Sequence, residues 1–442
     1  MKIERLVLKN FRGIRAMDLE LNERLTVLVG VNGSGKSSIL QALALPLSDV
    51  CRGAPYWLRD PISKAMEPTG VNNSDVLNGE SSGSISVYLK SDVGTDRPDF
   101  DLEIARDERH GVNGTAATGL TKSASVEQME QSLRRDPKSL GSLLAMRYIP
   151  ERYISPKFDD VVDGNAVAPR SAYSSALSCG RGFWRMFHWM SERQNAEAQE
   201  LEVPWKDALE MLKEGTRPPG ADPHLHAARK TIADFMGGTG LHYSQKDGTF
   251  LIHKDGQTMS VNQLSDGEKG LLALVGDLTH RLSLTHPHLT DTETLLRKAE
   301  AVVMIDEMEM HLHPSWQRMV VPRLVETFPN VQFIITTHSP QVLSHVEDKS
   351  VFLLRQTDEG IVHTRLAEAY GQSYERLLED VFGVAARPDE IQQEMDELFD
   401  LIQRNGIQQA RQKLDELRRR IGTDPDLVRA GFLLHRKEEA AK

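Results

Sequence analysis

The sequence predicts an α/β fold in which a mainly parallel sheet is joined by an antiparallel β subdomain, a helical insertion and a C-terminal helical hairpin. Three largely apolar runs, at residues 25–29, 301–305 and 331–337, indicate the parallel sheet. They lack polar alternation, as strands buried on both faces do. A glycine-rich loop, an acidic pair and a histidine follow these three runs. The carboxyl ends of parallel strands meet at one edge of a sheet, so we expect one site there.

Composition indicates a globular protein with room for two or three domains, or for one core with large insertions. Of its 442 residues, 39% are apolar and 26% are charged. No run approaches the ~18 apolar residues of a membrane helix, and the N-terminus carries no apolar signal segment, so we expect a cytoplasmic protein without a membrane partner. The two cysteines, Cys51 and Cys179, form no C-x-x-C pair. A net charge of −11 means that any nucleic-acid binding must use a local basic patch.

The first part of the chain, residues 1–145, is expected to form an N-terminal lobe. Residues 2–9 and 17–21 alternate as two strands around a turn, and residues 85–89 and 100–104 alternate as an antiparallel pair. Residues 46–83 and 107–142 are mostly irregular, apart from a helix expected at 125–133. Residues 143–149 resemble a further strand.

Residues 146–260 are expected to form a helical insertion followed by hairpins. Residues 183–213 favour a helix whose aromatic side chains are better explained by core packing than by a stacking platform for bases. His224 and His226 lie near a helix start without further metal ligands, so we assign them no chemistry. Asp247-Gly248 and Asp255-Gly256 predict hairpin turns.

The glycine-rich loop, residues 30–37, fits the pattern G-x-x-x-x-G-K-[ST] between a strand and a helix. Backbone N–H groups of such a loop and the following helix N-terminus bind nucleotide phosphates, a lysine reaches the terminal phosphates, and the hydroxyl at its end binds Mg²⁺. A chance glycine-rich turn is the alternative. The residues expected to bind the nucleotide here are Asn32, Gly33, Ser34, Gly35, Lys36, Ser37 and Ser38, with Ser37 also a metal ligand.

The acidic pair Asp306-Glu307 ends the second buried run. Asp306 can hold Mg²⁺ through its water shell, and Glu307 can orient and deprotonate an attacking water. A capping pair for the next helix is the alternative. His338 follows the third run and could donate to the terminal phosphate, or be an ordinary loop histidine. Glu309, His311 and His313 do not predict a metal site, because Pro314 follows at once and no further ligand is suitably spaced.

Between these motifs, residues 264–270 open an apolar helix at 271–284. Ser265 and Gly267 could place a hydroxyl and several N–H groups on a phosphate. An ordinary helix cap explains the same residues. Residues 261–365 are expected to form the lobe that carries this segment, the acidic pair and His338.

In this order the four motifs resemble the Walker A, signature, Walker B and switch-histidine motifs of ABC-type ATPase heads. Residues 8–13, residues 306–314 and residues 337–340 are similar to the RecF/SMC/OLD branch. The resemblance covers residues 1–45 and 260–355 well and the middle by architecture. Asp266 stands where the transporter signature has a glycine, and the glutamine of the Q-loop, expected near residues 146–152, is not assigned. The C-terminal part resembles small stand-alone ATPases without a TOPRIM nuclease, including PtuA-like anti-phage ATPases.

The resemblance implies an ATPase with ATP and Mg²⁺ as cofactors, whose catalytic residues are Lys36, Glu307 and His338. It implies a nucleotide-sandwich homodimer, or a higher assembly of such dimers, in which Ser265 and Gly267 complete the partner's site, with Arg12 at the nucleotide. A separately encoded, nuclease-like effector is the implied protein partner, and DNA is a candidate partner. An SMC/RecF-like repair clamp and a transporter nucleotide-binding subunit are the alternatives. The sequence lacks the sustained heptads that a repair clamp of SMC kind would need. Residues 309–314 and 337–340 argue against the transporter subunit.

The C-terminal region, residues 366–442, carries two apolar stripes at helical spacing, separated by Gly406. These predict a helical hairpin that packs either on the protein's own head or also on a second dimer or an effector. A hairpin that used one stripe would leave Phe399, Leu401, Leu433 or Leu434 exposed. Candidate basic patches, at residues 134–135 and 418–420, are short and are equally explained as solvated helix faces.

Overall fold

The computed structural model describes residues 2–56, 71–90, 99–106, 116–124, 126–128, 144–150, 176, 182–385 and 387–440. They form two compact units, residues 1–372 and 373–442, each considered by itself below. The helix expected at 125–133, the basic pair at 134–135 and the end of the expected Q-loop segment fall largely or wholly outside the described residues.

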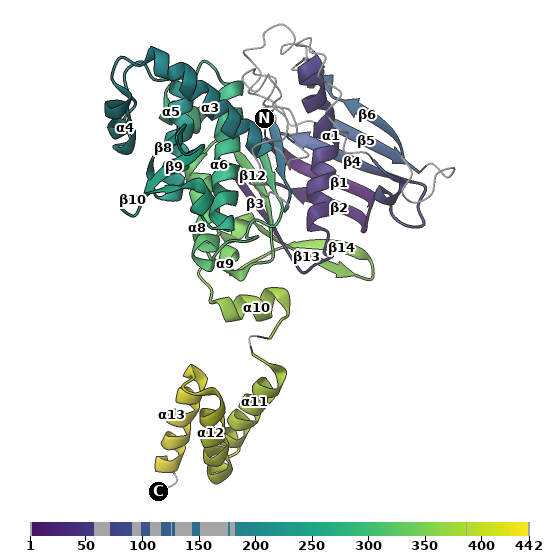
Figure 1. Cartoon of the computed structure of the whole chain (residues 1–442). Coiled ribbons are helices and arrows are strands. Elements are labelled where there is room, and N and C mark those ends of the chain that lie inside the picture. The colour runs from purple at the N-terminus through teal and green to yellow at the C-terminus, as the bar shows by residue number, and fades with distance from the viewer. Residues whose placement is uncertain are drawn as a thin grey trace. The chain divides into compact units, whose positions relative to one another are not determined.

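A six-stranded sheet in the order β14-β13-β3-β12-β11-β7 organises the first unit (Figure 1). Five strands of this sheet run parallel to one another: β13, β3, β12, β11 and β7. The edge strand β14 is antiparallel to β13. Nearly every residue of β3, β11 and β12 is buried, which explains their continuous apolar sequences and confirms the predicted parallel sheet. The bounds are β3 (Leu25–Val29), β7 (Ala145–Tyr148), β11 (Val302–Ile305), β12 (Gln332–Thr337), β13 (Val351–Thr357) and β14 (Gly360–Arg365).

A second, five-stranded antiparallel sheet has the order β2-β1-β4-β5-β6. It confirms the predicted β subdomain and shows that the two N-terminal strands belong to it. Helix α1 (Lys36–Tyr56) contacts strands of both sheets and so joins them (Figure 1). The bounds are β1 (Ile3–Phe11), β2 (Ile14–Glu20), β4 (Ser82–Leu89), β5 (Phe100–Ala105) and β6 (Ala117–Lys122).

The insertion contains helices α3 (Gly182–Glu200), α4 (Trp205–Lys213) and α5 (Pro223–Met236), and the sheet β10-β9-β8. Most of residues 183–213, which the sequence favours as helix, are helical, in the two helices α3 and α4. The two are separated before Pro204, which has no N–H with which to continue a helical ladder and occupies the N-cap position of α4. The predicted hairpins are confirmed by the pairing of β8 (Thr239–Ser244), β9 (Thr249–Lys254) and β10 (Gln257–Ser260).

Helix α6 (Asp266–Thr285) is buried along nearly its whole length and contacts α3 and α5. The hydroxyl of Tyr148 on β7 donates to Asp277 of α6 at 2.8 Å, and Asp277 also accepts from Arg281 at 2.7 Å. All three side chains are buried, so a satisfied polar network fixes α6 beside the end of β7. The remaining helices of this unit are α7 (Thr292–Lys298), α8 (Pro314–Thr327) and α9 (Pro340–Leu343).

The second unit contains α10 (Tyr374–Phe382), α11 (Asp389–Gln403), α12 (Ile407–Ile421) and α13 (Pro425–Ala440). Helices α11 and α12 form the predicted hairpin, and α13, which the sequence analysis did not predict, packs on both. Leu434, which a hairpin using a single stripe would leave exposed, is 3% exposed in their shared core, and Phe399, Leu401 and Leu433 are partly buried against it. Among the described residues of the chain, no helix is both long enough and apolar enough to cross a membrane.

Candidate active site

The loop between β3 and α1 is wrapped tightly around the side chain of Lys36. Lys36 Nζ donates to the carbonyl oxygens of Gly30 and Val31, at 2.8 and 2.9 Å. Gly33 and Gly35 have φ values of 81° and 91°, which glycine adopts without strain. A Cβ atom on Gly35 would also lie 2.7 Å from Cδ1 of Ile361. Only glycine fits here, which explains the spacing of the motif.

The Lys36 ammonium is largely buried and lies near three carboxylates. Burial lowers the pKa of Lys36, and the negative charges of Glu309, Asp306 and Glu307 oppose that shift. Strands β3 and β11 flank β12 and run parallel to it, so the loops after them, with the lysine and with the acids, lie at the same edge of the sheet. The predicted meeting of Lys36 with Asp306 and Glu307 at one sheet edge is thus what the structure shows.

The acidic pair is held by the neighbouring strand. Thr336 of β12 donates its hydroxyl to Asp306 Oδ1 at 2.5 Å and accepts from the backbone N–H of Glu307 at 2.9 Å. The backbone N–H of Met308 bonds to the Thr336 carbonyl oxygen at 3.1 Å. One threonine therefore fixes both acids, with Asp306 buried and Glu307 more open.

His338 follows directly after β12 and contacts Glu309. Its backbone N–H donates to Glu309 Oε1 at 2.7 Å, and its ring Nδ1 lies 3.3 Å from the same oxygen. The sequence analysis placed Glu309 in the segment 306–314 that resembles the RecF/SMC/OLD branch and weighed it as a metal ligand with His311 and His313, but gave it no contact with His338. Both histidines are exposed, and no group of three or more metal-binding side chains occurs in the parts of the chain that the structure describes.

Arg12 lies in the turn between β1 and β2, beside the glycine-rich loop. Its backbone N–H donates to the Asp75 carbonyl oxygen and its Nε to Asp75 Oδ1, at 2.9 and 2.7 Å. A Cβ on Gly13 would lie 3.1 Å from the same Ile361 Cδ1 atom that Gly35 approaches, which places the two loops side by side. Sequence reasoning missed Ile361 and Asp75, because their roles depend on strand register rather than on a local motif.

Ser265 and Gly267 lie at the start of α6. Ser265 is its N-cap: the Ser265 hydroxyl accepts from the Glu268 backbone at 3.3 Å and donates to Glu268 Oε2 at 2.9 Å. Lys254 binds the other oxygen of Glu268 at 2.7 Å. Gly267 packs against the loop after β11, where a Cβ atom would collide with the carbonyl oxygen of His311. Gly267 thus approaches the loop that carries the acids, and neither Ser265 nor Gly267 shares a hydrogen bond with residues 30–37, all of which are described.

The site fits a nucleotide with a divalent metal ion. The hydroxyl of Ser34 is buried and has no hydrogen-bond partner, and a Cβ on Gly30 would lie 2.6 Å from it, so the loop is a close-fitting cradle with one unused polar atom. The Asp306 carboxylate and the Ser37 hydroxyl are hard oxygen ligands of the kind that Mg²⁺ prefers.

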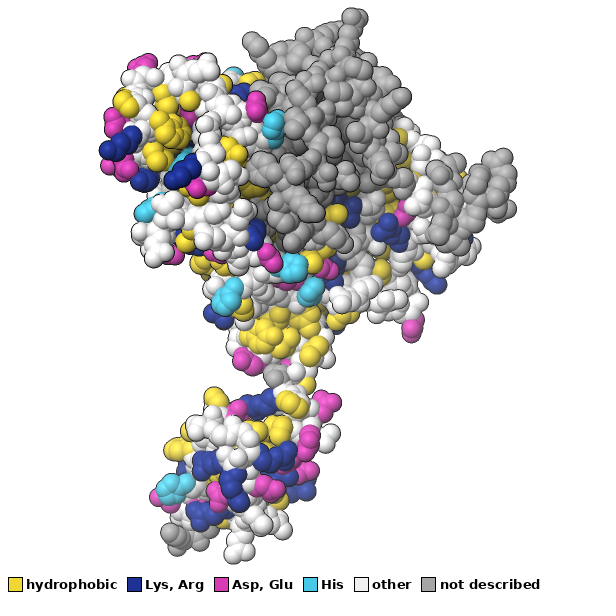
Figure 2. Space-filling model, viewed as in Figure 1, with side chains coloured by type: hydrophobic (Ala, Val, Ile, Leu, Met, Phe, Trp, Pro, Cys, Tyr) yellow, Lys and Arg dark blue, Asp and Glu magenta, His cyan; other side chains and the backbone are white. Residues whose placement is uncertain are grey.

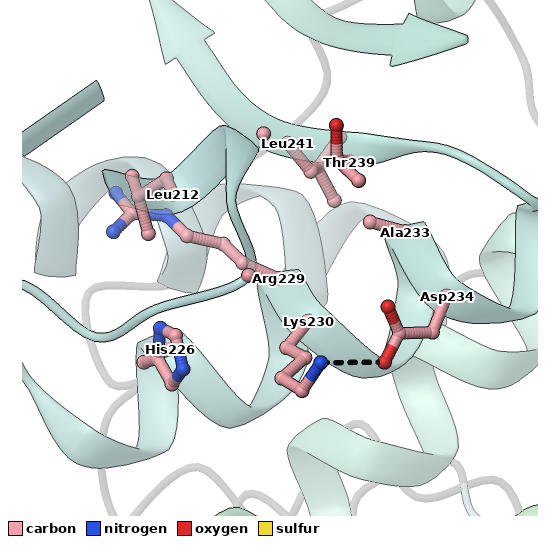
Figure 3. Close-up of a pocket in the computed structure, with 10 residues that line it drawn as sticks. Leu212, His226, Arg229, Lys230, Ala233, Asp234, Thr239 and Leu241 are labelled. Atoms are coloured by element: carbon pink, nitrogen blue, oxygen red, sulfur yellow. Dashed lines mark hydrogen bonds and ion pairs between the residues drawn. The ribbon is translucent and has the colours of Figure 1, made fainter. Parts of the chain in front are cut away.

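A separate pocket lies between α4, α5 and β8 (Figure 3). Lys230 and Asp234, one turn apart on α5, pair at 2.9 Å, and Arg229 donates to Glu197 and Gln194 at 2.7 and 2.8 Å. Burial lowers the pKa of His226 to about 4, with the charges of Arg229, Arg217 and Lys230 adding to that effect. The pocket contains none of the predicted site residues.

The glycine-rich loop, the buried lysine, the strand-end acids and the histidine define a P-loop ATPase. The chain belongs to the family described as "AAA domain, putative AbiEii toxin, Type IV TA system", whose model matches residues 25–344. This membership confirms the predicted ATPase and implies nucleotide binding.

The chain is similar to several known proteins. The chain is 25% identical to the Retron Ec83 probable ATPase of Escherichia coli, over 88% of this chain and 78% of that protein. It is 33% identical to the Septu protein PtuA of Bacillus mycoides (strain KBAB4), over 28% of this chain and 16% of that protein. An SMC head bound to the C-winged helix domain of ScpA aligns over 84% of this chain and 99% of that chain, with 16% identity and a TM-score of 0.45. The predicted resemblance to PtuA-like ATPases is confirmed.

Proposed function

We propose that the chain is an ATP-driven switch that closes as a nucleotide-sandwich homodimer and controls a separate, nuclease-like effector in anti-phage defence. The observation that carries the proposal is the convergence of Lys36, the strand-end acids and His338 at one sheet edge, inside the region that the family model matches. The relatedness to a retron ATPase and to PtuA favours defence over transport or a repair clamp.

In the proposed reaction, residues 32–38 bind the phosphates through backbone N–H groups, with Arg12 beside them. Lys36 leaves the carbonyl oxygens of Gly30 and Val31 for the terminal phosphates, which are stronger partners for an ammonium group. Glu307 orients the attacking water and accepts its proton, and His338 donates to the terminal phosphate. Asp306 and Ser37 would hold Mg²⁺, which when bound offsets the phosphate charge.

The partner copy supplies the second half of each site through the start of α6. Its N-cap Ser265, the adjacent N–H groups and the helix dipole suit an anion. Asp266 is 68% exposed at its side chain and adds a negative charge nearby, which Lys269 approaches at 3.5 Å. Two closed dimers could associate further through the second unit, consistent with the proposed higher assembly.

DNA contact by the chain alone is proposed to be weak and salt-sensitive. The net charge is −11, and Arg420 of the candidate patch at 418–420 is paired with Glu390 and Glu394. On the face of α11 to α13 that Figure 2 shows, basic and acidic side chains are interspersed. We therefore assign nucleic-acid sensing to the assembly of this chain with its effector, and not to the chain alone.

The test is ATP hydrolysis by the purified chain and by Lys36→Ala, with Lys246→Ala, an exposed hairpin lysine, as the matched control. We expect hydrolysis by the wild type and the control and none by Lys36→Ala. Copurification from the native host then identifies the effector. Equal hydrolysis by Lys36→Ala would refute the assignment of the site.

A further inference from the structure

The loop after β11 is joined to the end of β12 in a regular order. Asp306 and the N–H of Glu307 bond to the Thr336 hydroxyl, the N–H of Met308 bonds to the Thr336 carbonyl oxygen, and Glu309 bonds to the N–H of His338. Residues 306–308 of the loop thus bond to Thr336, and Glu309 bonds to His338, two residues further along. The proposed function uses Asp306, Glu307 and His338 and leaves Glu309 without a role.

Glu309 is placed differently from an ordinary loop acid. Its side chain is 7% exposed, whereas the His338 side chain is 42% exposed. Glu309 Oε1 accepts from the His338 backbone and lies 3.3 Å from ring Nδ1. Glu309 Oε2 is buried without a hydrogen-bond partner. A buried acceptor that lacks a donor is costly, so stability alone does not explain a carboxylate at this position.

The surroundings of Glu309 face the nucleotide side of the sheet. Among the three acids near Lys36, Glu309 exerts the largest effect on the lysine. The carboxylate therefore acts electrostatically on the lysine while it contacts the histidine. An ionised carboxylate only accepts hydrogen bonds, so a proton on ring Nδ1 of His338 is favoured when that nitrogen faces Oε1. Ring Nε2 then faces away from the pair, and it can donate to a phosphate oxygen once it also takes up a proton from solvent, so that both ring N–H groups lie between two anions.

We propose that Glu309 is the positioning residue of His338: it fixes the backbone and the ring of the histidine so that Nε2 is presented to the terminal phosphate. The inference rests on the proposed function, because it deepens the role of His338 in ATP hydrolysis. Glu309 itself contacts neither the nucleotide nor the reacting atoms.

The kinetic test compares Glu309→Ala, His338→Ala and the double variant, with Glu326→Ala as a control that removes an exposed carboxylate from α8. We expect Glu309→Ala to lower kcat about 10- to 100-fold, the size typical of outer-shell partners of functional histidines, with nucleotide affinity unchanged. In the His338→Ala background the same change should have no further effect on kcat. An unchanged kcat in Glu309→Ala, or independent multiplicative effects in the double variant, would overturn the proposal.

Glu309→Gln separates positioning from folding, since it retains an oxygen for the His338 N–H but removes the charge. We expect a smaller loss of kcat than in Glu309→Ala, with a melting temperature equal to or above that of the wild type. A lowered melting temperature with unchanged kcat would show that Glu309 is structural and would also overturn the proposal.

A spectroscopic measurement keeps this inference separate from the proposed function. Nitrogen-15 NMR of histidine-labelled full-length chain, without nucleotide, reports which ring nitrogen of His338 carries the proton. We expect the Nδ1-protonated form in the wild type and a shift toward the Nε2-protonated form in Glu309→Ala. Identical ring signals in both proteins refute the positioning role, whereas failure of the proposed function would show as a wild type that does not hydrolyse ATP.

Discussion

At the scale of single residues, Glu307 has an unusual backbone. Its φ is 46°, in the left-handed region, although it is not a glycine. Such a conformation costs on the order of 1–3 kcal/mol and concentrates at functional sites. The hydrogen bond from its N–H to Thr336 holds it there. Strain at the residue assigned as the base agrees with its proposed role.

We predict that Glu307→Gln binds ATP but hydrolyses it roughly 10²-fold more slowly, because an amide cannot accept the proton of the attacking water. Lys36, Ser37 and Asp306 remain in place in this variant. Single-turnover hydrolysis and equilibrium nucleotide binding measure the two effects. Hydrolysis at the wild-type rate would remove Glu307 from the mechanism.

Gly267 and Gly270 offer a matched pair of substitutions in the first turns of α6. A Cβ on Gly267 would collide with the His311 carbonyl oxygen, whereas nothing lies within 4 Å of a Cβ on Gly270. We predict that Gly267→Ala destabilises the protein by about 1–3 kcal/mol through overpacking against backbone. Gly270→Ala should stabilise it by about 0.5–1 kcal/mol through helix propensity. Chemical denaturation measures both; equal stabilities would show that the contact with His311 is loose.

At the scale of elements, the parallel strands could be predicted because continuous apolar runs report burial on both faces. The sequence analysis did not predict helix α13. Ala430 adds little apolar signal to the buried stripe of this helix, and the exposed apolar residues Val428 and Phe432 obscure the helical spacing of that stripe. The nucleotide loop could be predicted because its chemistry is local in sequence. The partnership of Glu309 with His338 could not, since it joins loops 29 residues apart and depends on β11 pairing with β12.

Helix α5 provides a prediction of pH dependence. Burial lowers the pKa of His226 from 6.5 to about 4 in the folded protein. The unfolded chain therefore binds a proton first as the pH falls, so this contribution to stability is complete above pH 6.5 and is lost between 6.5 and 4. Between pH 7.5 and pH 5 the loss due to His226 is about 2 kcal/mol.

Urea unfolding of His226→Gln at the two pH values should show a smaller change than the wild type. Burial also lowers the pKa values of His224, His242, His286 and His363, so acid destabilises both proteins. The difference between the two proteins isolates His226, and exposed His345→Gln serves as the control. Parallel pH profiles for the wild type and His226→Gln would contradict the prediction.

At the scale of the whole molecule, the proposed sandwich predicts association that depends on ATP. Glu307→Gln should sediment as a dimer with ATP and as a monomer without it, because slow hydrolysis preserves the nucleotide between the copies. Lys36→Ala should remain monomeric under both conditions. A Glu307→Gln sample that keeps its nucleotide-free mass in saturating ATP would disprove the sandwich.

The second unit has its own apolar core, formed by α11, α12 and α13. We therefore predict that deletion of residues 373–442 leaves a folded chain that binds and hydrolyses ATP but loses higher assembly and the effector. Circular dichroism, hydrolysis and light scattering test the three properties. Unfolding of the truncated chain, or unchanged assembly and effector binding, would refute a docking role for this unit.

In the proposed sandwich, the cap of α6 would act as a barrier to premature association. Ser265 already donates its hydroxyl to Glu268, whose second oxygen is held by Lys254. In the proposed sandwich, a phosphate that approaches from another copy competes for the same hydroxyl. Docking would then replace the Glu268 carboxylate with that phosphate as the acceptor of the Ser265 hydroxyl. The more highly charged triphosphate competes better than the diphosphate. If the proposed sandwich forms, a carboxylate within the chain would set how much triphosphate is needed before two copies stay together, and the proposed switch would stay open until then.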